Sequence, residues 1–371
     1  MLKREVTTLH FGLLSAFAVI GCIALLAATP ACAAPNRASG DDEEVRAGPS
    51  LQPIIFQPND HRFRFLPLTN YVNTAFDTAQ VSGTFSQDGY WKNHETVFEE
   101  IFDPHDSIKA DGGYGKLLQQ EFASSHVLPN ITLHLLGNGY DFRALAEWFS
   151  HHGACYPYVW AFLSSYAGYV GNEAIEASNP KIDSLDHIAD LYFFNLLGNF
   201  LFMSDLVADT AQNTLHMRNW VGQPFVDVRN GRILNASNNY VLRPALFGNG
   251  LRPFIYFGLH YLGGVSIALP DESSLSFGAG LATVDPLREG NAFADNLEKI
   301  QPSGGVFWDQ DDRLLASVIF NSTDFYRVRA NLYPDILRTS ELDMGFFLGV
   351  SDDGTPSFGL TFHQLLALGF R

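Results

Sequence analysis

The chain has 371 residues, which is enough for a large core in one or two domains, and its formal net charge is −17. A chain this acidic repels nucleic acid, and no basic stripe offsets the charge, so nucleic-acid binding is excluded. Charged residues make up only 17 % of the sequence, whereas phenylalanine occurs 31 times. This composition suits a protein with two apolar environments, a core and a lipid belt.

By pattern, residues 1–33 form a secretory signal peptide. Two positive residues precede the apolar run 11–28, and a small-residue cleavage site ends at Ala33. An uncleaved membrane anchor is one alternative, because the run has about the length of a short spanning helix. A lipoprotein is the other, because the residues up to Cys22 resemble a lipobox.

The number of cysteines in the exported chain depends on that cleavage. The chain has 3 cysteines, and cleavage removes Cys22 and Cys32, so Cys155 alone remains. We therefore expect no internal disulfide, and a fold held by packing or by a closed sheet. Residues 34–50, after the cut, are polar and acidic and are predicted to be a disordered linker.

Residues 51–113 are predicted to form N-terminal strands and loops. The segments 54–56 and 62–65 are apolar or alternate between apolar and charged residues, and breaks flank them, as in strands. One short helix is expected around residues 96–102.

Residues 114–215 change to a helical period and are predicted to be a helical insert. Helices are expected over 115–125, 141–151, 157–177 and 184–211. Pro180 separates the last two, which predicts a helical hairpin. The hairpin is apolar enough for two inner-membrane spans, but regular polar residues favour helices packed inside or beneath a barrel.

Residues 216–371 change to period two and are predicted to be β-barrel strands. Strands are expected over 238–246, 253–262, 275–284, 314–321, 326–332, 342–350 and 358–370. In the third, Leu275, Phe277, Ala279 and Leu281 share one face. The turn at 351–356 predicts a hairpin between the last two strands.

The predicted fold is mainly antiparallel β with an inserted helical region: an outer-membrane-type β-barrel, or barrel-like sheet, carrying a helical hairpin. Phe370 near the C-terminus resembles the signal that barrel-assembly machinery reads, so that machinery and outer-membrane lipid are the expected partners. The sequence does not identify any other protein partner, and it does not identify a cofactor. Aromatic residues near strand ends favour the membrane; they are Tyr240, Tyr256, Tyr261, Trp308, Tyr326 and Tyr333. A soluble periplasmic sandwich or barrel shares the alternation and is the alternative.

The densest group of polar residues lies in the helical hairpin. Carboxylates and a histidine that face each other from two helices can bind a metal or act in acid–base catalysis. The metal candidates are Glu173, Glu176, Asp186, His187 and Asp190, and all but Glu176 are also catalytic candidates. The alternative is structural, because acidic residues at a helix start cap it and favour its dipole.

A second group, His134, Arg143 and Glu147, is a candidate ligand site. Arg143 and Glu147 lie four residues apart on a helix, so a simple salt bridge is the alternative. Hydrolase and phosphate-loop motifs are missing from the sequence, so an enzyme is the less favoured interpretation.

Short motifs over about residues 131–200 resemble a family of uncharacterised bacterial envelope proteins. They are His134 to Gly137 with Tyr140 and Arg143, then Asn172-Glu173 with Glu176, then Ser184, Asp186 and Gly198-Asn199. Asn172 stands where the family has Trp, and Asn199 where it has Glu. The resemblance implies export and outer-membrane placement but no activity, and it marks Arg143, Glu173 and Asp186 as anchors.

Together these patterns predict an outer-membrane protein whose helices act as plug or platform, with a structural role or a role in passage or binding of a small or lipidic ligand. A lipid-modifying envelope enzyme that uses the acidic and histidine cluster is one alternative. A soluble periplasmic binding module is the other.

Overall fold

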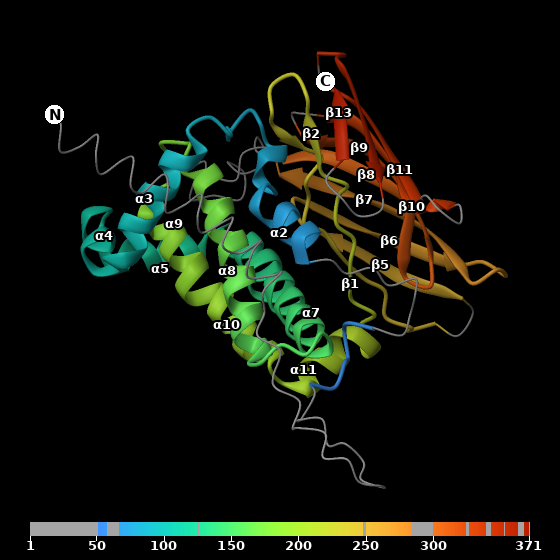
Figure 1. Cartoon of the computed structure of the whole chain (residues 1–371), viewed down its shortest axis with the longest axis horizontal. Coiled ribbons are helices and arrows are strands. Elements are labelled where there is room, and N and C mark those ends of the chain that lie inside the picture. The colour runs from blue at the N-terminus through green and yellow to red at the C-terminus, as the bar shows by residue number, and fades with distance from the viewer. Residues whose placement is uncertain are drawn as a thin grey trace, which may run out of the picture.

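A computed structural model describes residues 51–57, 67–124, 126–247, 250–283, 300–323, 326–338, 343–351, 353–362 and 367–370. The predicted signal peptide and acidic linker lie outside these residues. The described chain forms a helical domain followed by a curled sheet (Figure 1). The prediction of a mainly antiparallel β fold with an inserted helical region is confirmed at this level.

The helices run from residue 67 to residue 214. They are α2 (Pro67–Ala75), η1 (Thr78–Gln80), α3 (Tyr90–Phe102), α4 (Pro104–Ala110), α5 (Gly113–Ala123), α6 (Val127–Pro129), η2 (Asn130–Gly137), α7 (Asn138–His151), α8 (Pro157–Glu176), α9 (Ser184–Ile188), η3 (Ala189–Phe194), α10 (Asn195–Phe202), α11 (Asp205–Asp209) and η4 (Thr210–Thr214). Of these, η2, η3 and η4 are π-helical. Such segments occur often at functional sites.

The long helix α8 organises this domain. Pro157 starts it at a position that needs no backbone N–H, and the helix carries no charge before Glu173. Its glycines let α2 approach closely, because a Cβ on Gly171 would lie 2.8 Å from the Cβ of Ala75. As a result, the C-terminal half of α8 is buried, and Glu173 is buried with it.

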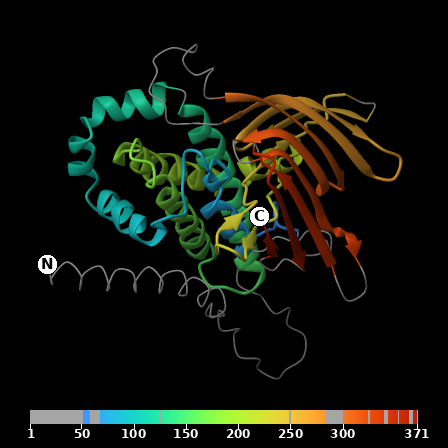
Figure 2. The same ribbon diagram turned by 90° about the horizontal axis from the view of Figure 1, so that it is seen from above.

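Within the described residues, thirteen strands form one sheet in the order β1-β4-β5-β6-β7-β8-β9-β10-β11-β12-β13-β2-β3. They are β1 (Arg218–Asn219), β2 (Phe225–Asp227), β3 (Ile233–Leu234), β4 (Tyr240–Leu242), β5 (Leu251–Phe257), β6 (His260–Ala268), β7 (Ser273–Thr283), β8 (Ile300–Gln310), β9 (Arg313–Thr323), β10 (Tyr326–Arg338), β11 (Asp343–Val350), β12 (Pro356–Phe362) and β13 (Ala367–Phe370). From β4 to β13 every pairing is antiparallel, and β13 pairs with β2 in parallel. The sheet curls into an open half-barrel (Figure 2).

The two faces of the sheet differ in polarity. On β7, Leu275, Phe277, Ala279 and Leu281 alternate with the buried Ser276 and its neighbours, as the sequence predicts. Register places the exposed apolar side chains of β5 to β12 on the same face, which we call the outer face. They are Ile255, Val265, Ile267, Phe277, Leu281, Trp308, Phe320, Leu332, Leu348, Val350, Phe358 and Leu360.

The inner face carries buried aromatic and polar residues. Trp220, Phe254 and Phe307 pack together there. Arg243 donates to both carboxylate oxygens of Asp309, at 2.6 and 2.9 Å. Since the side chains of Arg243 and Asp309 are 1 % and 0 % exposed, this is a fully buried ion pair.

The helical domain lies against this inner side (Figure 2). The amide of Asn73 on α2 donates to the carbonyl of Gly222, and its Oδ1 accepts the N–H of Ser237. Arg329 of β10 donates to Oε1 of Gln80 at 2.9 Å. These buried contacts fix the helices in the hollow of the half-barrel.

Several predicted elements were wrong. The predicted strand 54–56 is not formed, and α2, α3 and α4 occupy much of residues 51–113, where strands and loops were expected. The predicted strand 62–65 lies outside the described residues, and the helix expected around 96–102 lies within α3. The segment 253–262 is not one strand, because it spans the turn between β5 and β6. The segment 358–370 is not one strand either, because it is divided between β12 and β13, which pair antiparallel. β8 was missed, and the helix expected over 184–211 is broken into shorter pieces.

Two further expectations concern a cysteine and the aromatic residues. Cys155 is disulfide-bonded, and the other two cysteines lie outside the described residues. The expected absence of a disulfide concerns the chain cleaved after Ala33 and stays a prediction. Of the aromatic residues expected at strand ends, Tyr240, Tyr256 and Tyr326 are buried, while Trp308 is on the outer face.

Among the described residues, no single helix has the length and apolar character to cross a membrane. The segments Ser184–Phe202 and Asp205–Thr214 meet these criteria only as a pair, and the pair is bent by 88°.

Candidate metal centre

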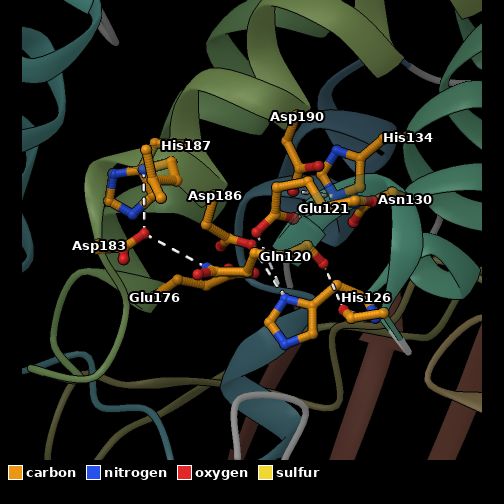
Figure 3. A network of polar contacts seen from close by, with 12 residues as sticks. Gln120, Glu121, His126, Asn130, His134, Glu176, Asp183, Asp186, His187 and Asp190 are labelled. Atoms are coloured by element: carbon orange, nitrogen blue, oxygen red, sulfur yellow. Dashed lines mark hydrogen bonds and ion pairs between the residues drawn. The ribbon is translucent and has the colours of Figure 1, made fainter. Parts of the chain in front are cut away.

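Eight titratable side chains meet inside the helical domain, where α5, η2, α8, α9 and η3 converge (Figure 3). They are Glu121, His126, His134, Glu173, Glu176, Asp186, His187 and Asp190. Seven are buried, and the side chain of His126 is 14 % exposed. We call this group the acidic–histidine cluster.

Helix α8 supplies two members of the cluster. Glu173 and Glu176 lie three residues apart and therefore on one face of the helix. Glu176 accepts a hydrogen bond from the amide of Asn172 at 2.7 Å. Glu173 is 0 % exposed, and neither of its carboxylate oxygens has a hydrogen-bond partner among the described residues.

The carboxylates near the start of α9 have two different roles, one structural and one in the cluster. Asp183 caps the helix by accepting the N–H of Leu185 at 3.1 Å, and Lys116 pairs with it at 2.7 Å. The structural interpretation therefore holds for Asp183. Asp186 and Asp190, one and two turns further on, are instead buried in the cluster (Figure 3).

His187 has the arrangement of a supported metal ligand. Its Nδ1 lies 2.7 Å from Oε2 of Glu100, and its Nε2 has no hydrogen-bond partner in the part of the chain that the structure describes. That Nε2 lies 4.0 Å from Oε2 of Glu173. Metal-binding histidines commonly use one ring nitrogen to contact a carboxylate and the other to bind the ion.

The donor atoms fall into three groups of three, each with all atoms within 4.8 Å of one another. The Asp186 triad is Glu121, His126 and Asp186; the Asp190 triad is His134, Glu173 and Asp190; the His187 triad is Glu173, Asp186 and His187. In the Asp190 triad, His134 Nε2 lies 3.1 Å from Asp190 Oδ2. Each triad offers nitrogen and oxygen donors at a spacing that one cation can bridge.

Burial controls the ionisation of the cluster. Burial raises the pKa of Glu173 well above its usual value, and the nearby Glu176 and Asp190 raise it further. Burial likewise raises the pKa of Asp190, with Asp186 adding to the effect. Burial lowers the pKa of His134 to about 4, so this imidazole is neutral at pH 7 and free to bind a metal.

His126 supplies the positive charge in the metal-free cluster. Burial alone would lower its pKa, but the carboxylates of Asp186 and Glu121, which form ion pairs with its Nδ1 at 3.9 and 3.7 Å, raise it to about 10. Burial would raise the pKa of Asp186, yet His126 outweighs burial and lowers it. In the described part of the chain, no lysine or arginine forms or lines this cluster.

A small cavity of about 60 Å³ opens between the triads. Its titratable lining residues include His126 and Asp186 from one triad and His134 and Asp190 from another. Such a volume holds a few water molecules. The cavity therefore gives a small polar molecule access to both triads.

The structure brings together most of the residues that the sequence singles out. All five predicted metal candidates lie in the cluster, and His134, predicted in another group, joins them. Arg143 and Glu147 lie outside the cluster and form an ion pair with each other at 2.6 Å. Glu147 also accepts the N–H groups of Ile55 and Phe56, so it anchors the N-terminal segment.

Sequence reasoning missed Glu121 and His126. They lie at the end of α5 and just after it, about thirty residues before the hairpin, and only the packing of α5 on α9 places them near Asp186. Their one local signal is that an acidic residue and a histidine flank a helix end.

No protein-family model matches the chain, and neither the curated proteins nor the solved structures contain a significant match. The resemblance to bacterial envelope proteins stays a prediction.

Proposed function

We propose that this chain is a cell-envelope metalloprotein whose helical domain binds a divalent transition-metal cation in the acidic–histidine cluster. The observation that carries the proposal is the set of buried donors that lack partners: both oxygens of Glu173, Nε2 of His187 and Oδ1 of Asp190. Buried polar groups are rarely left without partners, because each lost hydrogen bond costs about 1–3 kcal/mol. A bound cation would satisfy these atoms together.

The chemistry of the donors supports a particular class of metal. The cluster mixes imidazole nitrogen with carboxylate oxygen and contains no thiolate. Magnesium and calcium favour all-oxygen sites, whereas zinc, iron, manganese and cobalt accept this mixture. A divalent transition metal is therefore the favoured class, and Co²⁺ is a suitable spectroscopic probe for it.

Titration of the detergent-purified full chain with Co²⁺ tests the proposal. We expect visible absorption from bound cobalt in the wild type, and at least a tenfold loss of affinity in His134→Gln, because removal of one ligand weakens the site. The matched control is His152→Gln, which removes an exposed histidine outside the cluster. Equal affinity in His134→Gln and wild type would show that cobalt binds elsewhere.

A second proposal concerns location: we propose that the outer face of the sheet contacts outer-membrane lipid. The supporting observation is its polarity, because exposed apolar side chains from β5 to β12 cover one face while ion pairs and hydroxyls line the other. A soluble sandwich directs its apolar faces inward, and large exposed apolar patches mark interaction sites. The expected partners remain outer-membrane lipid and the barrel-assembly machinery.

Flotation of the full chain with phosphatidylcholine vesicles tests the lipid contact. We expect the wild type to float and Phe277→Arg to float poorly, since arginine at a lipid-facing position costs about 2–4 kcal/mol. Phe102→Arg is the matched control, because Phe102 is 80 % exposed but lies on α3, away from the sheet. A wild type that stays at the bottom of the gradient would refute the proposal.

The two alternative functions, a lipid-modifying envelope enzyme and a soluble periplasmic binding module, stay predictions. A lipid-modifying enzyme would need to bring a lipid to the cluster, and the cavity of about 60 Å³ is small for a lipid headgroup. A periplasmic location is the outcome if the protein does not associate with lipid.

A further inference from the structure

We infer that the acidic–histidine cluster is built for two cations, one in the Asp186 triad and one in the Asp190 triad. This inference rests on the proposed metal-binding function and specifies its stoichiometry. The two triads have no residue in common, so two ions can bind without competing for a ligand. A site for one ion would need only one of them.

The His187 triad connects the other two. It shares Asp186 with one triad and Glu173 with the other. Carboxylates can bind two metal ions through their two oxygens, and dinuclear sites in helical bundles are built from facing glutamates and histidines. Glu173 and Asp186 are thus the side chains placed to contact both cations, and His187 completes the ligand set between them.

The charge of the cluster also favours two ions. Glu121, Glu173, Glu176, Asp186 and Asp190 carry five negative charges when ionised, and all five are buried. When His126 has lost its proton to bind a cation, one divalent cation leaves a buried excess of about three negative charges, whereas two leave about one. Two cations therefore allow the carboxylates to ionise together, which neighbouring buried carboxylates otherwise oppose.

The cavity defines what such a centre would accept. It borders histidine and aspartate side chains of both triads, so a molecule inside it would contact both cations. At about 60 Å³ it admits water or a similarly small polar molecule. The substrate class is therefore a small polar molecule, and polymers and lipid tails are excluded from the space between the ions.

Metal stoichiometry of the full chain, measured by mass spectrometry of the elements after Co²⁺ loading and gel filtration, tests the inference. We expect two equivalents in the wild type. We expect one equivalent in Glu121→Gln/His126→Gln and one in His134→Gln/Asp190→Asn, because each pair removes ligands of a single triad. His151→Gln/His152→Gln, which changes exposed histidines, is the control and should keep two.

The outcomes separate the two proposals. One equivalent in the wild type would overturn the two-cation centre and leave the metal-binding function standing. No bound cobalt in the wild type would overturn both. Loss of both ions in either paired variant, with circular dichroism and thermal unfolding unchanged, would also contradict two separate triads.

Discussion

Glu173→Gln is expected to make the metal-free protein more stable and to abolish its stabilisation by metal. The carboxyl of Glu173 is fully buried without a hydrogen-bond partner, and its pKa is raised well above the usual value. In the metal-free protein at pH 7, folding must either protonate this group or bury its charge. Glutamine has nearly the same shape and no charge, so the variant should be more stable by as much as about 3 kcal/mol.

The sign of this effect depends on pH and on metal. Because the folded-state pKa is raised, the destabilisation by Glu173 is absent below the unfolded value of about 4.5 and grows as the pH rises. The difference between variant and wild type in urea unfolding with chelator should therefore shrink towards zero at pH 4.5. With Co²⁺ the order should reverse, since only the wild type keeps the ligand. A variant less stable than wild type under chelation would contradict this account.

Arg243→Met is expected to destabilise the protein by about 3–5 kcal/mol, because it leaves a buried carboxylate without its partner. Asp309 is 0 % exposed and receives two hydrogen bonds from the Arg243 guanidinium. Arg243 also contacts Asp312 at 2.6 Å and lies 4.9 Å from the ring centre of Trp220. The pair therefore ties β8 to the segment after β4, and urea unfolding of the variant should show the loss.

Two further variants separate charge from packing. Arg243→Met/Asp309→Leu removes both charges and should recover most of the lost stability, because uncharged residues of similar size often replace a buried ion pair at little cost. Arg232 pairs with Asp88 at 2.9 Å on the surface, with side chains 44 % and 80 % exposed. Arg232→Met should therefore cost less than about 1 kcal/mol. A double variant as unstable as Arg243→Met would assign the effect to packing.

Part of the fold could be predicted because local patterns agree with tertiary structure. Helix α8 begins at Pro157 and ends at Glu176, close to the predicted 157–177, because a proline start and an uncharged run specify it locally. The faces of β7 follow from its alternation. The hairpin of β11 and β12 follows from the turn residues between them.

Other elements could not be read from local patterns. The segment after Pro253 is apolar and aromatic throughout, and its turn lacks the Asn-Gly or Asp-Gly signal, so two strands look like one. β8 contains Pro302 and two glycines, which weaken a strand signal, yet its neighbours β7 and β9 hold it in register. A register shift in β10 turns Tyr326 inward, against the alternation of the strand.

The cluster was predictable where its residues are near in sequence. Glu173, Glu176, Asp186 and Asp190 lie on the consecutive helical segments α8, α9 and η3, so helical spacing already aligns them. Glu121, His126 and His134 come from α5, the turn after it and η2. Their approach to α9 and η3 depends on long-range packing, which a single sequence does not reveal.

Anomalous X-ray diffraction at the cobalt edge, from crystals of the full chain grown with Co²⁺, tests the metal centre most directly. We expect anomalous peaks inside the helical domain, with one bounded by His134, Glu173 and Asp190 and with donor atoms about 2.0–2.2 Å from the ion. Cobalt found only on exposed histidines such as His152, with no anomalous density in the acidic–histidine cluster, would contradict the account.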